Sequence, residues 1–129
     1  MNRFGKDEKI KSRAEMLDLF ENGKSIKSFP IRLIWNLDAP PEEGQKAAFS
    51  APKRSFKKAV TRNRLKRRMR EAYRLNRSEL EWNHVGKLKM MFVVQGSEAP
   101  KFQEIQDKII LLLQRLSQKL KRESFHEQN

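Results

Sequence analysis

The apolar residues of this chain fall into short periodic runs, and three of the runs have the spacing of strands. Residues 29–37 alternate, which predicts a strand with one apolar face. Residues 47–51 form a shorter strand candidate that Pro52 ends. Residues 88–95 are almost continuously apolar, which is typical of a central strand buried on both faces. The apolar face of the first run comprises Phe29, Ile31, Leu33, Trp35 and Leu37.

Three other runs have helical spacing. The first predicted helix begins at a capping box of Ser12 and Glu15 and ends at Asn22-Gly23. The second extends from Phe56 or Lys57 to Asn76, and the third has Pro100 in its first turn. The apolar positions are Met16, Leu17, Leu19 and Phe20 in the first helix, Leu65, Met69 and Ala72 with Tyr73 at the margin in the second, and Phe102, Ile105, Ile109, Leu113, Leu116 and Leu120 in the third.

The order of these elements is helix, strand, strand, helix, strand, helix. This order predicts an α+β or α/β sandwich in which helices pack on one sheet around a single core. No internal repeat or domain boundary is visible, so we expect one domain over residues 1–129, with flexible ends at 1–10 and 122–129.

The distribution of charge indicates a polyanionic partner. The chain has 29 Lys and Arg residues against 16 Asp and Glu residues, a net charge of +13. Twelve of those basic residues but only one acidic residue lie between Lys53 and Arg77, so this window alone carries +11. The alternative is a solvated basic helix that binds no partner. The repulsion between basic side chains three and four positions apart would destabilise such a helix unless a partner offset it. On the predicted second helix, the positions opposite the apolar stripe are Asn63, Arg67, Arg70 and Arg74.

The residues that catalysis usually requires are sparse. The absence of cysteine excludes disulfides, thiolate metal sites and cysteine nucleophiles. Of the two histidines, His84 lies in a predicted loop and His126 near the end of the chain, and no hydrolase, metal or phosphate-loop motif is present. We therefore expect no catalytic residues and no metal site in the protein itself. No apolar run approaches the length of a membrane span and no signal peptide is evident, which favours a cytoplasmic protein.

Residues 53–75, KRSFKKAVTRNRLKRRMREAYRL, closely resemble the signature of the bacterial ribonuclease P protein. That signature is a basic pair, a short spacer and then A-x-x-R-N-R-x-K-R-x-x-R-E. The L-F-x-N-G end of the first helix, the S-F-P-I-R-L and A-F-S-A-P-K runs and the apolar strand before the last helix also fall where the family has them. The matching signature residues are Lys53, Arg54, Ala59, Arg62, Asn63, Arg64, Lys66, Arg67, Arg70 and Glu71.

The resemblance implies a fold and a function. The family order is αβββαβα, with a left-handed βαβ crossover that contains the R-N-R helix, so a further strand is expected near residues 25–27. The family binds a catalytic RNA that removes the 5′ leader of precursor tRNA. The Mg²⁺ ions are held mainly by the RNA subunit and none by the protein alone. The implied partners are thus the catalytic RNA and precursor tRNA, with the protein monomeric in the holoenzyme.

The resemblance also implies roles for individual residues. Two groups are expected: an RNA-facing surface, and a cleft between the first helix and the sheet that holds the leader. Met16 departs from the phenylalanine that many members have at its position. Ala48 and Lys57 stand where glycine occurs in the family. The RNA-facing group is Lys53, Arg54, Arg62, Asn63, Arg64, Lys66, Arg67, Arg70 and Arg74, and the leader-cleft group is Phe20, Trp35, Ser50 and Met16.

Other classes of protein share the basic composition. A non-catalytic ribosomal protein or RNA-assembly factor fits the arginine-rich helix equally well, and only the dense signature disfavours it. A DNA-binding module is disfavoured because the helix packs its other face on a core and no dimer spacing is visible. A membrane-surface helix is disfavoured because the stripe of Leu65, Met69 and Ala72 is too thin to anchor it.

Overall fold

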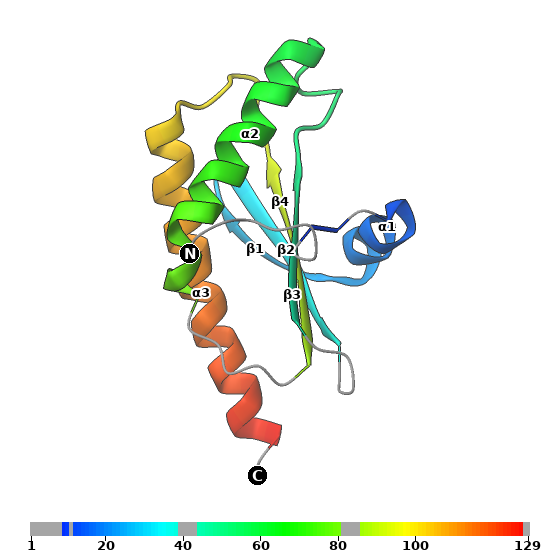
Figure 1. Ribbon diagram of the computed structural model, residues 1–129, viewed down its shortest axis with the longest axis vertical. Coiled ribbons are helices and arrows are strands. Elements are labelled where there is room, and N and C mark those ends of the chain that lie inside the picture. The colour runs from blue at the N-terminus through cyan, green and yellow to red at the C-terminus, as the bar shows by residue number, and fades with distance from the viewer. Residues whose placement is uncertain (1–8, 11, 39–43, 81–85, 128–129) are drawn as a thin grey trace.

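The computed structural model describes residues 9–10, 12–38, 44–80 and 86–127, with side chains described as far as Arg122 (Figure 1). Its helices and strands follow the order that the resemblance implied. They are α1 (Arg13–Asn22), β1 (Lys24–Ser28), β2 (Ile31–Asp38), β3 (Gly44–Ser50), α2 (Ala59–Asn76), the short 3-10 helix η2 (Arg77–Glu79), β4 (Lys87–Val94) and α3 (Phe102–Glu127).

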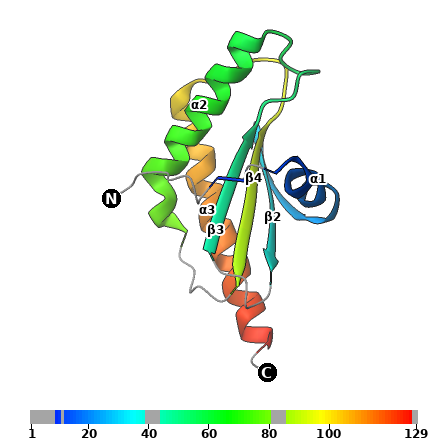
Figure 2. The ribbon, with the colours of Figure 1, turned by 45° about the vertical axis from the view of Figure 1, so that its right-hand side comes forward.

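One four-stranded mixed sheet organises the described residues. Its strand order is β1-β2-β4-β3, in which β1, β2 and β4 pair antiparallel and β3 pairs parallel to β4. The helix α2 therefore lies within a β3–α2–β4 crossover between neighbouring parallel strands. Helices α2 and α3 cover one face of the sheet, and α1 lies on the other face (Figures 1 and 2). The predicted α+β sandwich is confirmed.

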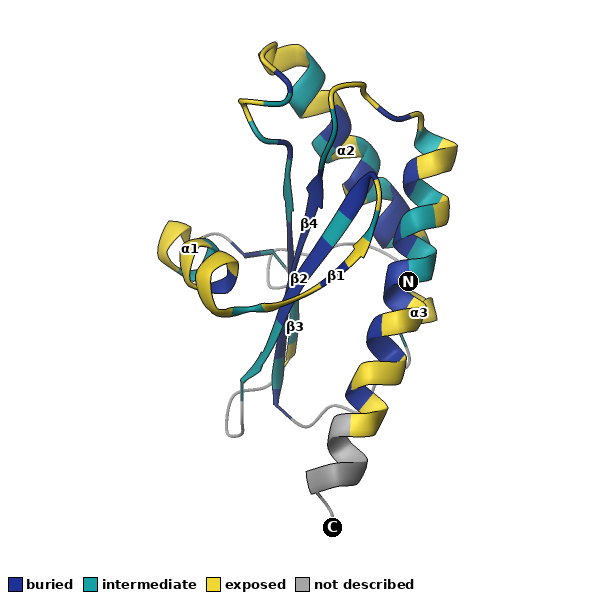
Figure 3. Cartoon of the chain, turned by 180° about the vertical axis from the view of Figure 1, so that it is seen from behind, coloured by how far each residue is buried: buried dark blue, intermediate teal, exposed yellow. Residues whose placement is uncertain are grey.

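The core consists of two clusters on opposite faces of the sheet. Figure 3 shows the buried positions along β2 and β4 and on α2 and α3. The larger cluster lies under α2 and α3 and the smaller lies under α1. The strand β4 supplies both, because Phe92 and its alternate neighbours face α2 and α3 while Met91 and Val93 face α1. The prediction of a central strand buried on both faces is confirmed.

Helix α1 has a defined start and a defined end. The Glu15 backbone N–H donates to the Ser12 hydroxyl over 3.3 Å, which confirms the predicted N-cap. Gly23 ends the helix where a Cβ would lie 2.5 Å from the Leu19 carbonyl oxygen. Immediately before α1, the Ile10 N–H donates to the Ala47 carbonyl over 3.1 Å, so this segment crosses the outer side of β3.

The element boundaries differ from the predictions at several points. Strand β3 begins at Gly44 rather than at Ala47 and ends at Ser50. Helix α2 begins at Ala59 because Phe56 belongs to a preceding turn and packs into the core. Phe29 lies in the β1–β2 turn rather than in a strand and is 69% exposed. Pro100 precedes α3, and that helix continues past Arg122 to Glu127.

Candidate nucleic-acid interface

Helix α2 presents the predicted arginine surface. Leu65, Met69, Ala72 and Tyr73 are buried against the sheet and α3, and each is at most 1% exposed. Asn63, Arg64, Arg67 and Arg70 are exposed on the outer side, whereas Lys66 and Arg74 are half-buried. In the segment before the helix, Lys53, Arg54, Lys57 and Lys58 are also exposed. The basic residues of the signature are therefore concentrated on α2 and on the segment that leads into it.

Three arginines of α2 are engaged within the protein. One Arg62 nitrogen, Nη1, donates to the carbonyl oxygens of Phe56 and Lys57, each over 2.8 Å. Arg68 Nη1 donates to the Pro100 carbonyl over 2.9 Å. Arg74 Nε donates to Glu71 over 3.2 Å, and this hydrogen bond lowers the pKa of the Glu71 carboxyl.

Three other arginines of α2 point outward: Arg64, Arg67 and Arg70, which we call the arginine face. Within the part of the chain that the structure describes, their guanidinium groups have no ion-pair partner. A guanidinium group offers a planar fork of N–H donors that matches phosphate geometry. The N-terminus of α2 adds positive electrostatic potential to that of the arginine face. Lys58 provides no side-chain cap and the first turn contains no acidic residue, so no side chain of the helix start neutralises the positive end of the helix dipole.

The sheet face that α1 covers carries a second group of basic residues. Along β2, β3 and β4, the positions that point away from α2 and α3 are apolar in the middle and charged towards the ends. The apolar positions pack against Leu19 and Met16 of α1. The polar and charged positions are half-buried, and they are Arg32, Asn36, Asp38, Lys46, Ser50, Lys87 and Lys89.

The leader-cleft residues predicted by resemblance divide between the two faces of the sheet. Phe20 is 52% exposed on α1, Met16 packs beside Leu19, and Ser50 lies at the end of β3. Trp35 is only 2% exposed and belongs to the core under α2 and α3. Its assignment to a cleft beside α1 is therefore wrong.

Strand alternation explains the placement of Trp35. Its neighbours two and four residues back, Leu33 and Ile31, face α2 and α3, so Trp35 must do so as well. The ammonium group of Lys24 lies 5.0 Å from the centroid of the Trp35 ring at the margin of this core. On the opposite face of β2, the corresponding position beside α1 is Ile34.

The prediction from sequence missed four basic residues on the α1 side of the sheet: Arg32, Lys46, Lys87 and Lys89. The signal that identifies them is again alternation. Each occupies a polar position that is out of phase with the buried residues of its strand. Read together with the strand pairing, that pattern places positive charge next to α1 as well as on α2.

One of these residues, Lys89, is held by an ion pair. Its ammonium group lies 3.0 Å from the Asp38 carboxylate, and Asn36 also donates to Asp38 over 3.2 Å. The hydrogen bond to Asp38 raises the pKa of Lys89, and the nearby carboxylates of Glu15 and Asp18 act in the same direction. This pair ties the end of β2 to β4.

The Lys89 pair predicts a pH dependence of stability. A raised lysine pKa contributes stability that is fully present below the ordinary pKa and is lost as pH rises through the folded value. Replacing Lys89 with Met should therefore cost about 1 kcal/mol of unfolding free energy at neutral pH. Urea unfolding of both proteins from about pH 9 to about pH 11.5 should show this difference disappear at the alkaline end. A difference that persists unchanged there would contradict the assignment.

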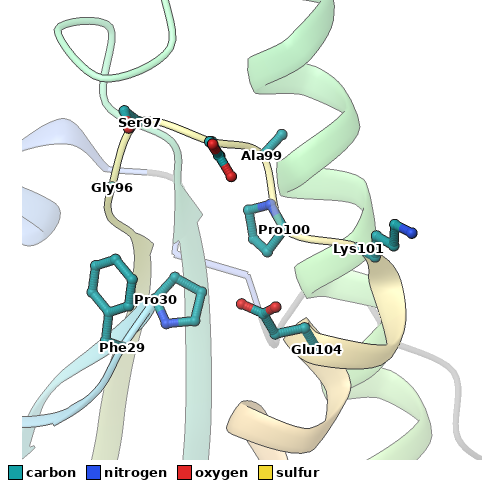
Figure 4. Close-up of a pocket in the computed structure, with 9 residues that line it drawn as sticks. Phe29, Pro30, Gly96, Ser97, Ala99, Pro100, Lys101 and Glu104 are labelled. Atoms are coloured by element: carbon teal, nitrogen blue, oxygen red, sulfur yellow. The ribbon is translucent and has the colours of Figure 1, made fainter.

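A pocket of about 370 Å³ lies between the β1–β2 turn and the start of α3 (Figure 4). Its walls include the Phe29 ring and the carboxylates of Glu98 and Glu104, and Figure 4 shows Glu104 directed toward Pro30. Pro100, whose carbonyl holds Arg68, forms another wall. Two carboxylates repel an anion, so this pocket is unsuited to a phosphate group.

The described residues offer little for metal binding. Residues 9–10, 12–38, 44–80 and 86–127 contain no group of three or more His, Cys, Asp or Glu side chains that could hold a metal ion. His84 lies outside the described residues, and the side chain of His126 is not described. In that same part of the chain, no helix has the length and apolar composition of a transmembrane segment.

Comparison with known proteins gives concordant matches. The family model described as Ribonuclease P matches residues 4–117. The ribonuclease P protein component of Porphyromonas gingivalis is 33% identical over 107 residues, which cover 78% of this chain and 77% of the relative. The ribonuclease P protein component of Chlorobaculum tepidum is 32% identical over 83 residues, which cover 61% of this chain and 54% of the relative.

Solved structures show the same fold. The ribonuclease P protein of Staphylococcus aureus matches with a TM-score of 0.68 at 18% identity, over 84% of this chain and 94% of that chain. The ribonuclease P protein of Thermotoga maritima matches with a TM-score of 0.67 at 22% identity, over 84% of this chain and 96% of that chain. At these identities the structural likeness concerns the fold, whereas the family model and the curated relatives bear on descent.

Proposed function

The chain belongs to the ribonuclease P protein family, and we propose that it acts as the protein subunit that binds the catalytic RNA and the 5′ leader of precursor tRNA. In this role it promotes endonucleolytic removal of the leader, while the RNA subunit performs the hydrolysis. The observation that carries the proposal is the arginine face. Three outward guanidinium groups on one helix, without acidic partners among the described residues, fit a run of phosphates.

Contacts to the leader are assigned to the other side of the molecule. A single-stranded leader needs stacking surfaces for its bases and cations for its phosphates. The exposed ring of Phe20 supplies a stacking surface, and Ser50 supplies a hydroxyl group. Arg32 and Lys46 lie on the same face of the sheet and supply positive charge.

The hydrolytic chemistry is assigned to the RNA and its Mg²⁺ ions. Mg²⁺ binds carboxylate and phosphate oxygens and keeps several of its waters. The described residues hold no carboxylate cluster suited to it, so the ions are expected on RNA phosphates and no step is assigned to a protein side chain. The contribution of the protein is to position the substrate and to lower the Mg²⁺ concentration that the reaction requires.

The proposal is tested by cleavage of a labelled precursor tRNA at low Mg²⁺ by the ribonuclease P RNA of the same organism, with and without the protein. We expect strong stimulation, and no cleavage by the protein alone. The variant Phe20→Ala should lose about tenfold in affinity for the precursor because one stacked base is worth about 1–3 kcal/mol. Its affinity for mature tRNA should remain unchanged, because mature tRNA has no leader.

Two results would contradict this proposal. If a folded protein that binds RNA tightly gave no stimulation, the role of a ribosomal or RNA-assembly protein would replace it. If Phe20→Ala weakened the binding of precursor and mature tRNA equally, the leader would lie elsewhere. Phe29→Ala is the matched control, because Phe29 is similarly exposed but lies in the β1–β2 turn beside the acidic pocket.

A further inference from the structure

Arg62, the first arginine of the R-N-R sequence, is directed back towards the chain that precedes α2. Its Nη1 donates to the carbonyls of Phe56 and Lys57. These are two successive residues of the segment between β3 and α2, residues 52–58, which we call the approach segment. A half-buried guanidinium group that spends its donors on backbone carbonyls has fewer donors left for phosphate.

The approach segment is fixed at three points. The backbone N–H groups of Ser55 and Phe56 donate to the Pro52 carbonyl over 3.1 and 3.0 Å and close a turn. The Phe56 ring is 5% exposed and packs into the main core. The third point is Arg62, which reaches the end of the segment from the first turns of α2. The exposed side chains of the segment include four cations: Lys53, Arg54, Lys57 and Lys58.

The position of Arg62 in the helix supports a positioning role. It lies four residues after the N-cap Lys58, where the helix dipole disfavours positive charge. The two carbonyl oxygens that it contacts carry partial negative charge and offset this cost. The contact with these carbonyls therefore explains why a positive charge is tolerated near the N-terminus of the helix, and no bound phosphate is needed to explain it.

We infer that Arg62 is a positioning residue that locks the approach segment to α2, so that Lys53 and Arg54 are presented to RNA together with the arginine face. This inference rests on the proposed function. It differs from the role that the family resemblance implies, in which Arg62 faces RNA as Arg64 does. The difference is measurable, because a positioning residue and a phosphate contact couple differently to Lys53 and Arg54.

The test is a double-mutant cycle on affinity for the ribonuclease P RNA. In the otherwise wild-type protein, replacing Lys53 and Arg54 with Ala removes two phosphate contacts and should weaken binding roughly 20-fold near physiological salt. With Arg62→Ala already present, the same pair of changes should cost less than about fivefold, because the unlocked segment has already lost most of its contribution. Additive losses would overturn the inference and make Arg62 an independent contact.

Two matched variants remove the same charge from the same helix. Arg64→Ala deletes a member of the arginine face. Arg68→Ala deletes a guanidinium–carbonyl hydrogen bond of the same kind, to Pro100 on another segment. In both backgrounds the Lys53 and Arg54 changes should retain their full effect of roughly 20-fold. A reduced effect in Arg68→Ala would attribute the coupling to general destabilisation of α2 and would overturn the inference.

Hydrogen exchange in the free protein provides a readout that needs no RNA. The Ser55 and Phe56 amide protons should exchange more than about tenfold faster in Arg62→Ala than in Arg64→Ala. Arg62→Lys, which keeps the charge, serves if the alanine variant does not fold, and it should show faster exchange too. Unchanged exchange would overturn the inference. Binding of the RNA by the wild-type protein without salt dependence would contradict the proposed function itself. Tight, salt-dependent binding with additive losses in the double-mutant cycle would reject only the positioning role of Arg62.

Discussion

Replacing Arg64, Arg67 and Arg70 together with alanine should weaken binding to the ribonuclease P RNA about 100-fold near physiological salt. Each phosphate contact contributes a factor of about five under these conditions because it releases a condensed counterion. The slope of the logarithm of affinity against the logarithm of salt concentration should fall by about 2–3. The fold should persist, since the three side chains are exposed and the buried side of α2 keeps Leu65 and Met69.

The matched control for this triple variant instead removes two cations from α3 and one from the residue before it. Lys101, Lys119 and Arg122 are exposed on that helix or just before it, and their replacement with alanine changes the net charge equally. Filter binding or fluorescence anisotropy across a salt series should show a loss several-fold smaller than that of the α2 triple variant. Equal losses would mean that RNA responds to net charge alone and would contradict the assignment of the arginine face.

Phe92→Ala is expected to be the most destabilising single change in the sheet, at about 3–5 kcal/mol of unfolding free energy. The side chain is fully buried in the middle of β4. Its ring centroid lies 5.7 Å from those of both Phe49 and Tyr73, so one truncation removes two aromatic contacts and leaves a cavity. A domain of this size has about 5–15 kcal/mol of total stability, so the variant should lose a large fraction of it.

Urea unfolding followed by circular dichroism measures this effect. Phe20→Ala makes the same chemical change at a side chain that is 52% exposed, and it should cost less than about 1 kcal/mol. The pair of variants therefore separates stability from function: Phe92 supports the fold, whereas Phe20 is assigned to the leader. A cost below about 1 kcal/mol for Phe92→Ala would mean that the core relaxes around the missing ring.

Much of the sheet could be predicted from hydrophobic pattern because its central strands bury residues on both faces. The apolar run at residues 88–95 and the alternation at 29–37 each identify a strand, and the structure contains both as β4 and β2. Strand β1 gave no such signal, because Lys-Ser-Ile-Lys-Ser has a single apolar residue, Ile26, opposite Leu33. Only the resemblance indicated a strand there.

The roles of individual site residues were harder to predict, because they depend on contacts between distant segments. A helical wheel separates the outward positions from the buried stripe, and this division is confirmed for Asn63, Arg67 and Arg70. Arg74, which the wheel placed with them, is half-buried and donates to Glu71. It cannot show that Arg68 meets a carbonyl 32 residues away. For Trp35 the strand pattern was right and the resemblance was wrong. Alternation grouped Trp35 with Leu33, where the structure has it, whereas the resemblance assigned it to the other face of the sheet. The RNA and leader contacts themselves remain predictions.

The two edges of the sheet have a consequence for how the protein behaves in concentrated solution. An open edge strand presents unpaired N–H and C=O groups that can recruit a strand from another molecule and seed aggregation. Here the backbone N–H of Ile10, before α1, donates to the Ala47 carbonyl of β3. At the other edge, Arg115 of α3 donates to the Lys27 carbonyl of β1 over 3.0 Å. Each edge strand therefore has one carbonyl group that already accepts a hydrogen bond from outside the sheet, which leaves fewer groups of that edge open to a strand from another molecule.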